Sequence, residues 1–471
     1  MHVESVIPTA HFSLIIAAVF SVMIAGCLQD KKGDSSGQGG QDDGLHRFVV
    51  IDPGHFHAAL VFKRAGYDGI SNDVGVYAPT VEDFTDHMNR VIPFNNRETD
   101  PAKWNYHIYL GDDFREAVFE ERFGDIAIFS GKNDIKIDNI MACIDSGFNV
   151  LADKPWVIEP EKFGMLDTIL TKAEEKGLVA YDIMTERFEI TSILQRLLVN
   201  HEPVFGTITS GSPEDPAVVK SSVHHLSKVV SGRQLKRPWW FFDTAVQGEG
   251  LVDITTHLVD LVFWILYPDQ AIDYTTDIEM VSAKHWPTQL SLSQYETITA
   301  NPEFPPQFKL DSDGTYPYFC NGQATFAVNG VHTQVEVVWN YEAPKGTGDT
   351  HYSIIKGSKA NVLVLQGQEQ NFSPKLYVEA VSGADHTAVG EALSSYLSSL
   401  TDYPGITTAE DGKRWRIDIP DTYSVGHEAH FGQVADAFLG YLGGEKMAAW
   451  EKPNMLAKYY VTTKALEMCR K

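Results

Sequence analysis

The sequence contains few cysteines and few positive charges, and both shortages exclude classes of protein. Four cysteines occur among 471 residues, and the three after Cys27 are too scattered for a disulfide framework or a structural zinc site. The 63 Asp and Glu residues outnumber 38 Lys and Arg, so the formal charge is -25. A surface of that sign repels a phosphate backbone, and we expect no nucleic-acid partner.

Long apolar runs are also scarce, and the one near the N-terminus is short for a membrane span. Residues 12–26 carry no charge and end in Ile-Ala-Gly before Cys27. This pattern resembles a bacterial lipoprotein signal, in which the cysteine is lipidated after cleavage; a retained membrane anchor is the alternative. We predict a signal peptide over residues 1–27, a flexible tether over 28–45, and an exported protein that is lipid-anchored to the cell envelope.

Short apolar runs alternate with amphipathic stretches over residues 46–185. Continuous apolar runs predict strands buried on both faces, and a polar, aperiodic stretch over 89–104 predicts an irregular segment. The expected strands are 48–51, 73–77, 106–109, 125–129, 150–152 and 178–181, and the expected helices include 112–122, 135–146 and 160–176. This order predicts an α/β fold with a doubly wound parallel sheet.

Residues 186–471 show a different pattern and predict an α+β domain with a large, mainly antiparallel open sheet. Several segments alternate apolar and polar residues, as half-exposed strands do. These strands are 323–328, 332–339, 351–356, 361–365 and 375–379, and helices are expected over 190–199, 429–442 and 454–468.

The stretch from Asn149 to Pro155 brings a lysine to the mouth of the predicted parallel sheet. Pro155 cannot continue strand pairing, so the strand ends beside Lys154. Open α/β sheets bind ligands at this edge. Lys154 is therefore a candidate proton carrier or cofactor clamp, and an ordinary Lys-Asp pair at the strand end is the alternative.

The turn after the first strand retains only part of a dinucleotide-binding fingerprint. In the pattern G-x-G-x-x-G, Gly54 keeps the middle position, Asp52 replaces the first glycine, and His57 or Ala58 stands at the third. His55 and His57 have the spacing of metal ligands. Because one turn supplies at most two ligands and no acid is near in sequence, we expect no metal.

Asp253 and His257 form the second candidate cluster. A helix over 251–266 would place them four residues apart on one face, where a carboxylate can orient an imidazole. Histidine titrates near neutrality and suits the removal of a hydroxyl proton. The alternative is an acid at a helix start with a half-buried histidine, and we expect His427 and His430 to be structural.

Several motifs between Phe48 and Trp264 resemble the Gfo/Idh/MocA oxidoreductases, which include glucose-fructose oxidoreductase. They are Val150 to Pro155, Glu175-Lys-Gly177, Glu186-Arg-Phe188, Arg237-Pro-Trp239, and the series Gly248, Gly250, Asp253 and His257. The resemblance implies a Rossmann domain for NAD or NADP, and an open second sheet that is a possible homo-oligomer interface. It also implies a lysine near the nicotinamide at Lys154, an aspartate at Asp253 and a catalytic histidine at His257.

The site residues expected on these grounds fall into two groups beside that catalytic trio. The cofactor-binding candidates are Gly54, His55, Phe56, His57, Ser130, Asn133, Asp153 and Lys154, and the substrate-binding candidates are Arg187, Arg237, Trp239 and Trp240. The expected function is oxidation of a carbohydrate secondary alcohol to a keto-sugar by tightly bound NAD(P). The alternatives are an NAD-dependent glycosidase or lyase that works by transient oxidation and elimination, and a non-catalytic sugar-binding lipoprotein.

Overall fold

The computed structural model describes residues 43–230 and 233–471. The predicted signal peptide with Cys27, and nearly all of the predicted tether, lie outside the described residues. Among the described helices, none has the length and apolar character needed to cross a bilayer.

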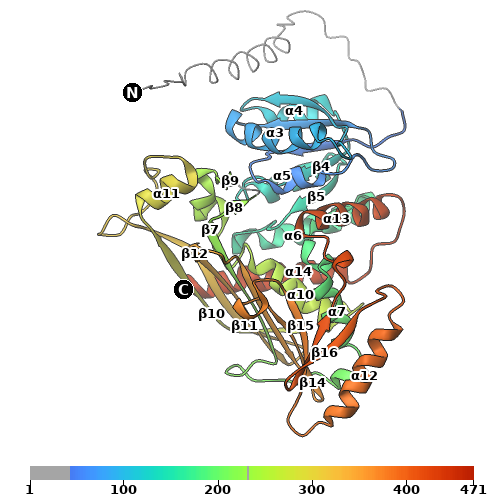
Figure 1. Cartoon of the computed structure of the whole chain (residues 1–471). Coiled ribbons are helices and arrows are strands. Elements are labelled where there is room, and N and C mark those ends of the chain that lie inside the picture. Colours follow the sequence, from blue (N-terminus) through green and yellow to red (C-terminus); the bar gives the residue numbers. More distant parts are fainter. Residues whose placement is uncertain (1–42, 231–232) are drawn as a thin grey trace, which may run out of the picture. The chain divides into compact units, whose positions relative to one another are not determined.

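Six parallel strands form the sheet of the first half, in the order β3-β2-β1-β4-β5-β6 (Figure 1). They are β1 (Phe48–Ile51), β2 (Asp73–Ala78), β3 (Asn105–Leu110), β4 (Ile126–Phe129), β5 (Asn149–Asp153) and β6 (Ala180–Ile183). β1, β4 and β5 are buried along their whole length. The strand order reverses between β1 and β4, and ligands of such folds bind at the carboxyl ends of the strands there.

The connecting helices match the predicted alternation except at one place. They are α2 (His57–Val61), α3 (Val81–Asn96), α4 (Phe114–Glu121), α5 (Lys136–Asp145), the 3-10 turn η1 (Pro160–Lys162) and α6 (Phe163–Lys176). The irregular segment predicted over 89–104 is wrong in its first half, because α3 continues to Asn96. Phe84, Met88 and Val91 recur at helical spacing and pack into the core, which holds α3 together despite Pro93.

Nine strands form the second sheet, in the order β10-β11-β12-β7-β13-β14-β15-β17-β16. All neighbours are antiparallel except β12 and β7. The strands are β7 (Val218–Ser227), β10 (Ile278–Leu290), β11 (Tyr316–Val328), β12 (Val331–Glu342), β13 (Thr350–Lys356), β14 (Ala360–Leu365), β15 (Lys375–Ala380), β16 (Thr407–Asp411) and β17 (Arg414–Asp418), with a small hairpin of β8 (Val229–Val230) and β9 (Arg233–Gln234) beside them. The predicted fold class, a doubly wound parallel sheet followed by a large, mainly antiparallel sheet, is confirmed.

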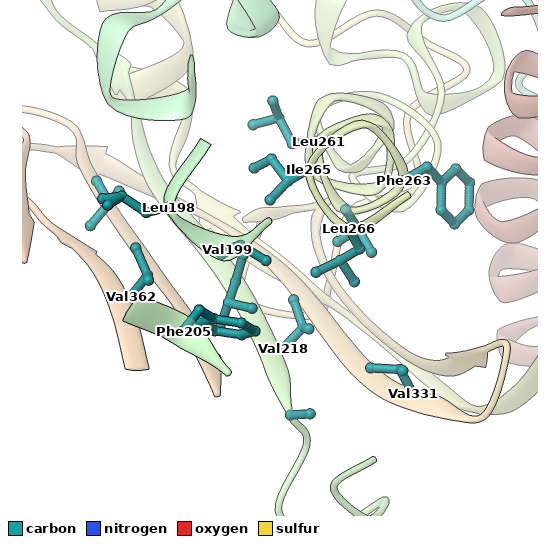
Figure 2. Packing of buried hydrophobic residues seen from close by; sticks show 14 of the residues in the cluster. Leu198, Val199, Phe205, Val218, Leu261, Phe263, Ile265, Leu266, Val331 and Val362 are labelled. Atoms are coloured by element: carbon teal, nitrogen blue, oxygen red, sulfur yellow. The ribbon is translucent and has the colours of Figure 1, made fainter. Parts of the chain in front are cut away.

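Helices cover one face of the large sheet and form the main apolar core with it. Figure 2 shows Leu261 and Ile265 of α10 beside Leu198 of α7 and Val218 of β7. The helical elements of this half are η2 (Thr185–Phe188), α7 (Ile190–Val199), α8 (Glu202–Phe205), η3 (Trp239–Phe242), α9 (Thr244–Gln247), α10 (Thr255–Leu266), α11 (Leu292–Thr299), η4 (Gln368–Gln370), α12 (His386–Ser399), η5 (Asp421–Tyr423), α13 (His427–Leu442) and α14 (Glu451–Cys469). The predicted domain boundary at residue 185/186 falls within η2.

The last two helices return to the parallel sheet. Phe431 and Phe438 of α13 belong to the apolar core on one side of the parallel sheet, and Tyr459 of α14 belongs to the core on its other side. α14 also packs along β10 of the large sheet. The C-terminal helices therefore connect both sheets, and residues 45–471 form one compact unit.

Candidate active site

A cavity of about 480 Å³ lies between the carboxyl ends of the parallel strands and the large sheet. Its lining from the parallel sheet comes from the ends of β1, β4 and β5, where the order of strands reverses. Its opposite wall comes from β7, β12, β13 and α10. The predicted site residues among its lining are His55, Phe56, His57, Asn133, Asp153, Lys154, Arg237, Asp253 and His257.

Lys154 and Asp253 meet in this cavity although 99 residues separate them. The Lys154 Nζ atom lies 2.5 Å from Asp253 Oδ1, and both side chains are less than a tenth exposed. The second oxygen of Asp253 accepts a hydrogen bond from Gln247 Nε2 at 3.1 Å. Lys154 precedes the cis peptide bond to Pro155, directly after β5 ends. The ion pair fixes the position of the Lys154 ammonium group at the end of the parallel sheet.

The predicted start of the helix at residue 251 is wrong, so Asp253 and His257 do not lie on one helix. α10 begins at Thr255, so Asp253 precedes the helix. The preceding turn is held against β11, since the Gly250 amide donates to Phe319 O at 3.1 Å. A Cβ at Gly250 would lie 2.0 Å from Cys320 O, so this close approach requires glycine. The carboxylate of Asp253 consequently faces Lys154 and Gln247.

His257 lies on the cavity wall with a ring nitrogen available. Its Nδ1 atom is buried and has no hydrogen-bond partner within the described part of the chain. Burial, and next the positive charge of Lys154, lower the pKa of His257 well below its usual value. The imidazole is therefore neutral at physiological pH and can accept a proton or a hydrogen bond.

Some of the predicted cofactor residues at the turn between β1 and α2 line the cavity, and others do not. His55, Phe56 and His57 line the cavity, but Ser130 is fully buried and braces the turn. The Ser130 hydroxyl donates to His55 O at 2.7 Å and accepts from the Ala58 amide at 3.0 Å.

Gly54 lies under Trp240 of η3. A Cβ there would lie 2.6 Å from the indole ring and 2.9 Å from a carboxylate oxygen of Asp83. The Trp240 Nε1 atom donates to the same carboxylate at 3.2 Å, and Lys132 forms ion pairs with Asp83 and Asp52. The absence of a side chain at Gly54, the middle glycine of the fingerprint, therefore leaves room for the indole of Trp240.

His55, His57 and Asp153 form a cluster beside the ion pair. His57 Nδ1 lies 2.8 Å from Asp153 Oδ2, and His55 Nδ1 lies 3.6 Å from the same oxygen. Burial alone would raise the pKa of Asp153, but the charge and hydrogen bond of His57 outweigh it and lower that pKa. Burial, followed by the neighbouring His57, lowers the pKa of His55 well below its usual value.

Asn133 forms hydrogen bonds that connect the two halves of the chain. Its side-chain amide donates to Gln247 O at 2.8 Å, and its oxygen accepts from Lys136 Nζ at 2.6 Å. Lys136 further donates to the backbone oxygen of Asp153 at 3.0 Å. These bonds position the end of β5.

The four predicted substrate residues separate in the structure. Arg237 lines the cavity, with its guanidinium 4.4 Å from the Phe241 ring centre, but Trp239 and Trp240 do not. The placement of Arg187 is a correction. All three of its guanidinium nitrogens bond the carboxylates of Asp260 and Glu451, because these buried acids need a cation, and it is absent from the cavity lining.

The cavity is also lined by residues that were not among the predicted site residues. They are Glu186, Gln195, Lys220, His224, Trp339, Asp349 and His351, together with His427 and His430, which were expected to be structural. Lys220, Ser222 and His224 alternate along β7, so a period of two was the available signal. Asp349 ties this wall together by hydrogen-bonding His225 Nδ1 at 3.0 Å and contacting Lys228.

Comparisons with known proteins agree with this architecture. Residues 194–470 match the family model described as "Putative oxidoreductase C terminal domain". The crystal structure of a "putative oxidoreductase" from Parabacteroides merdae is 46% identical, has a TM-score of 0.88, and is matched over 91% of this chain and 98% of that chain. None of the curated proteins matches the chain.

More distant structures share the fold at low identity. Levoglucosan dehydrogenase in complex with NADH and levoglucosan has a TM-score of 0.56 at 12% identity, with 90% of this chain and 97% of that chain covered. A 3-ketoreductase from Actinomadura kijaniata in complex with NADP has a TM-score of 0.52 at 14% identity, with 91% and 97% covered. At these identities the likeness shows the fold alone.

Proposed function

Because the chain belongs to the oxidoreductase family whose C-terminal domain spans residues 194–470, we propose that it is an NAD(P)-dependent oxidoreductase of the Gfo/Idh/MocA type that oxidises a carbohydrate. The observation that carries the proposal is the Lys154-Asp253 ion pair beside the unpartnered nitrogen of His257, at the end of the parallel sheet. The distant likeness to levoglucosan dehydrogenase supports a sugar substrate.

The residues at the cavity fit the nicotinamide end of a dinucleotide. His55, Phe56, Asn133 and Lys154 come from the ends of β1, β4 and β5, where such folds bind the cofactor. The pyrophosphate of the dinucleotide would lie at Gly54, which Trp240 covers. The pyrophosphate can fit there only when the indole turns away. The proposal therefore includes a movement of Trp240 on cofactor binding.

The bound nicotinamide supplies the hydride acceptor for the alcohol carbon. His257 takes the hydroxyl proton, since its lowered pKa keeps the ring neutral and its Nδ1 atom is free to accept. Lys154, fixed by Asp253, keeps a positive charge beside the oxygen on which negative charge develops.

The far wall of the cavity suits a sugar. Lys220, His224, Arg237 and Asp349 offer donors and acceptors for hydroxyl groups, and Trp339 adds an aromatic surface for the apolar face of a pyranose. A volume of about 480 Å³ lies within the usual range of small-molecule sites.

The test uses full-length protein with NAD or NADP and a panel of mono- and disaccharides. We expect the nucleotide to raise the melting temperature, reduced nicotinamide to form with a carbohydrate, and His257→Ala to lower turnover at least about 100-fold. His386→Ala, on α12 outside the cavity, is the matched control. If neither nucleotide raises the melting temperature and no sugar is oxidised, the redox proposal fails, and sugar binding without turnover would support a binding protein instead.

Elimination after transient oxidation is the second candidate, and Glu186 is the observation that favours it. Burial, with Glu189 adding to it, raises the pKa of Glu186 to about 7, which suits a second proton carrier in the same cavity. Release of the aglycone from an aryl glycoside without net reduced nicotinamide is the expected signature. Glu186→Gln should then slow this release and leave simple oxidation unchanged.

We also propose that the protein is exported and anchored through a lipid on Cys27. The apolar run that ends in Ile-Ala-Gly before this cysteine supports the proposal. Cys27→Ser should move the protein from the membrane fraction to the soluble fraction, whereas an unchanged distribution contradicts lipid anchoring.

The nine-stranded sheet is the proposed contact between copies of the chain. Support comes from the resemblance to oxidoreductases that associate through this sheet. Light scattering of the purified protein should give a multiple of the chain mass, and a monomer at high concentration contradicts the proposal.

A further inference from the structure

Three side chains that commonly bind metals meet at the rim of the cavity. His55 and His57 lie in the turn after β1, and Asp153 is the last residue of β5, which is separated from β1 by β4 alone. One potential ligand atom from each lies within 4.8 Å of the other two. Both imidazoles lie near the same carboxylate oxygen of Asp153, and their rings are perpendicular with centres 4.1 Å apart.

Hydrogen bonding accounts for one of these imidazoles only. His57 Nδ1 bonds Asp153 Oδ2 at 2.8 Å, but the 3.6 Å distance from His55 Nδ1 is too long for a hydrogen bond. His55 Nδ1 is buried and has no hydrogen-bond partner among the described residues. A buried nitrogen of this kind is costly unless another group satisfies it.

The distances suit a common metal centre. Zinc lies about 2.0 to 2.2 Å from imidazole nitrogen and carboxylate oxygen, so tetrahedral ligand atoms are separated by about 3.4 Å. The separations of 2.8 and 3.6 Å between Asp153 Oδ2 and the two histidine nitrogens bracket that value, and all three ligand atoms lie within 4.8 Å of one another. Small side-chain shifts would bring all three atoms to one ion.

The surrounding charges leave the carboxylate available. Within the described part of the chain, Asp153 forms ion pairs with the two histidines and with no lysine or arginine. Lys154 is engaged by Asp253, and Lys136 bonds the backbone oxygen of Asp153. Among the described residues, Asp153 is the carboxylate that forms ion pairs with His55 and His57.

We propose that His55, His57 and Asp153 bind one divalent transition-metal ion, with a coordination position open to the cavity. All three residues line the cavity, and three protein ligands with an open position are typical of catalytic zinc sites. The site shares His55 with the proposed cofactor site, but zinc binding to nucleotide-free protein tests the metal proposal separately from sugar oxidation.

Zinc alone is the first probe, applied to full-length protein that has been treated with a chelator. Competition with a chromophoric chelator should show one Zn²⁺ per chain. His55→Ala is the sharpest variant because its Nδ1 has no hydrogen bond to lose. It should weaken zinc binding at least about tenfold while the metal-free melting temperature stays the same or rises. Asp153→Ala should also weaken binding, and His386→Ala should not.

Cobalt(II) gives a second measurement on the unaltered protein. We expect the visible absorption of a four- or five-coordinate site, reduced in His55→Ala. Equal zinc affinity in His55→Ala and the unaltered protein overturns the proposal. If a variant does not fold, a cobalt spectrum of the unaltered protein that matches hydrated cobalt overturns it as well.

Discussion

At the scale of single residues, the buried pair of Lys154 and Asp253 joins the two halves of the active site. Removing one member of a buried pair leaves a charge without compensation, which costs about 3 to 5 kcal/mol. We expect Lys154→Met to destabilise the protein by this amount. In the double variant with Asp253→Asn the loss should be clearly smaller than the sum of the single losses, since Gln247 can still bond the new amide.

Urea unfolding of the four proteins in this cycle measures the coupling. Strictly additive losses would contradict a direct interaction between the two side chains. Both single variants should also lose carbohydrate oxidation, because the positive charge beside His257 is then missing or misplaced.

Trp240 lies against Gly54, and this contact gives a second prediction at the residue scale. If the competent conformation is a minor one, the apparent affinity for NAD(P) is reduced by its population. Trp240→Ala should therefore tighten dinucleotide binding about tenfold. Because the lost indole costs about 3 to 5 kcal/mol of stability, calorimetric titration should be done well below the melting temperature.

Trp239→Ala is the matched control, since Trp239 neighbours Trp240 in η3 and does not line the cavity. It should leave the dissociation constant unchanged. Weaker dinucleotide binding by Trp240→Ala would mean that the indole is part of the cofactor site.

At the scale of elements, the local sequence pattern was sufficient to predict the bounds of a strand or helix when the residues within it determine where it begins and ends. The continuous apolar run before Pro155 located β5 to within one residue at each end, and α7 has the predicted bounds. β6 begins two residues later than predicted, because burial against its neighbour and not composition sets the register.

The candidate site was less predictable because its geometry depends on contacts between distant elements. Asp253 left the predicted helix because Gly250 is drawn onto β11, which no local pattern shows. Asp153 joins His57 across 96 residues, and its distance in sequence led to the expectation of no metal. The roles assigned to Lys154, Asp253 and His257 remain predictions for the variants described above.

Glu186 of η2 and Lys220 of β7, which both line the cavity, should make the free energy of unfolding depend on pH. Burial raises the pKa of Glu186 from 4.5 to about 7, so the folded state holds a proton that the unfolded state has lost in this window. Stability should fall as pH rises from 4.5 to 7. Burial also lowers the pKa of Lys220 from 10.5 to about 7, so the unfolded state binds more protons and stability should rise between 7 and 10.5.

Glu186→Gln should remove the acidic part of this dependence, and Lys220→Met the alkaline part. Urea unfolding at a series of pH values measures both. A slope that is the same in Glu186→Gln and the unaltered protein below pH 7 would show that another group titrates.

At the scale of the whole molecule, the C-terminal helix α14 joins what the sequence suggests are separate domains. Lys458 is almost fully buried and its Nζ atom bonds Asp182 of β6 at 2.9 Å and Asp260 of α10 at 3.3 Å. Asp260 in turn bonds Arg187. One side chain therefore connects the parallel sheet to the helix layer of the large sheet. Its position could not be predicted, because helical periodicity does not say which sheet a C-terminal helix meets.

Lys458→Met should accordingly destabilise the entire unit and not its C-terminus alone. The substitution leaves Asp182 without its cation in a buried place, and we expect a loss of about 3 to 5 kcal/mol in urea unfolding. Lys464→Met in the same helix is the control, because its ion pair with Glu467 is half-exposed and is worth less than about 1 kcal/mol. In Lys458→Met, both sheets should unfold in one transition, and carbohydrate oxidation should be lost in that same transition. Equal losses for the two variants would mean that apolar packing of α14, and not this charge network, connects the two sheets.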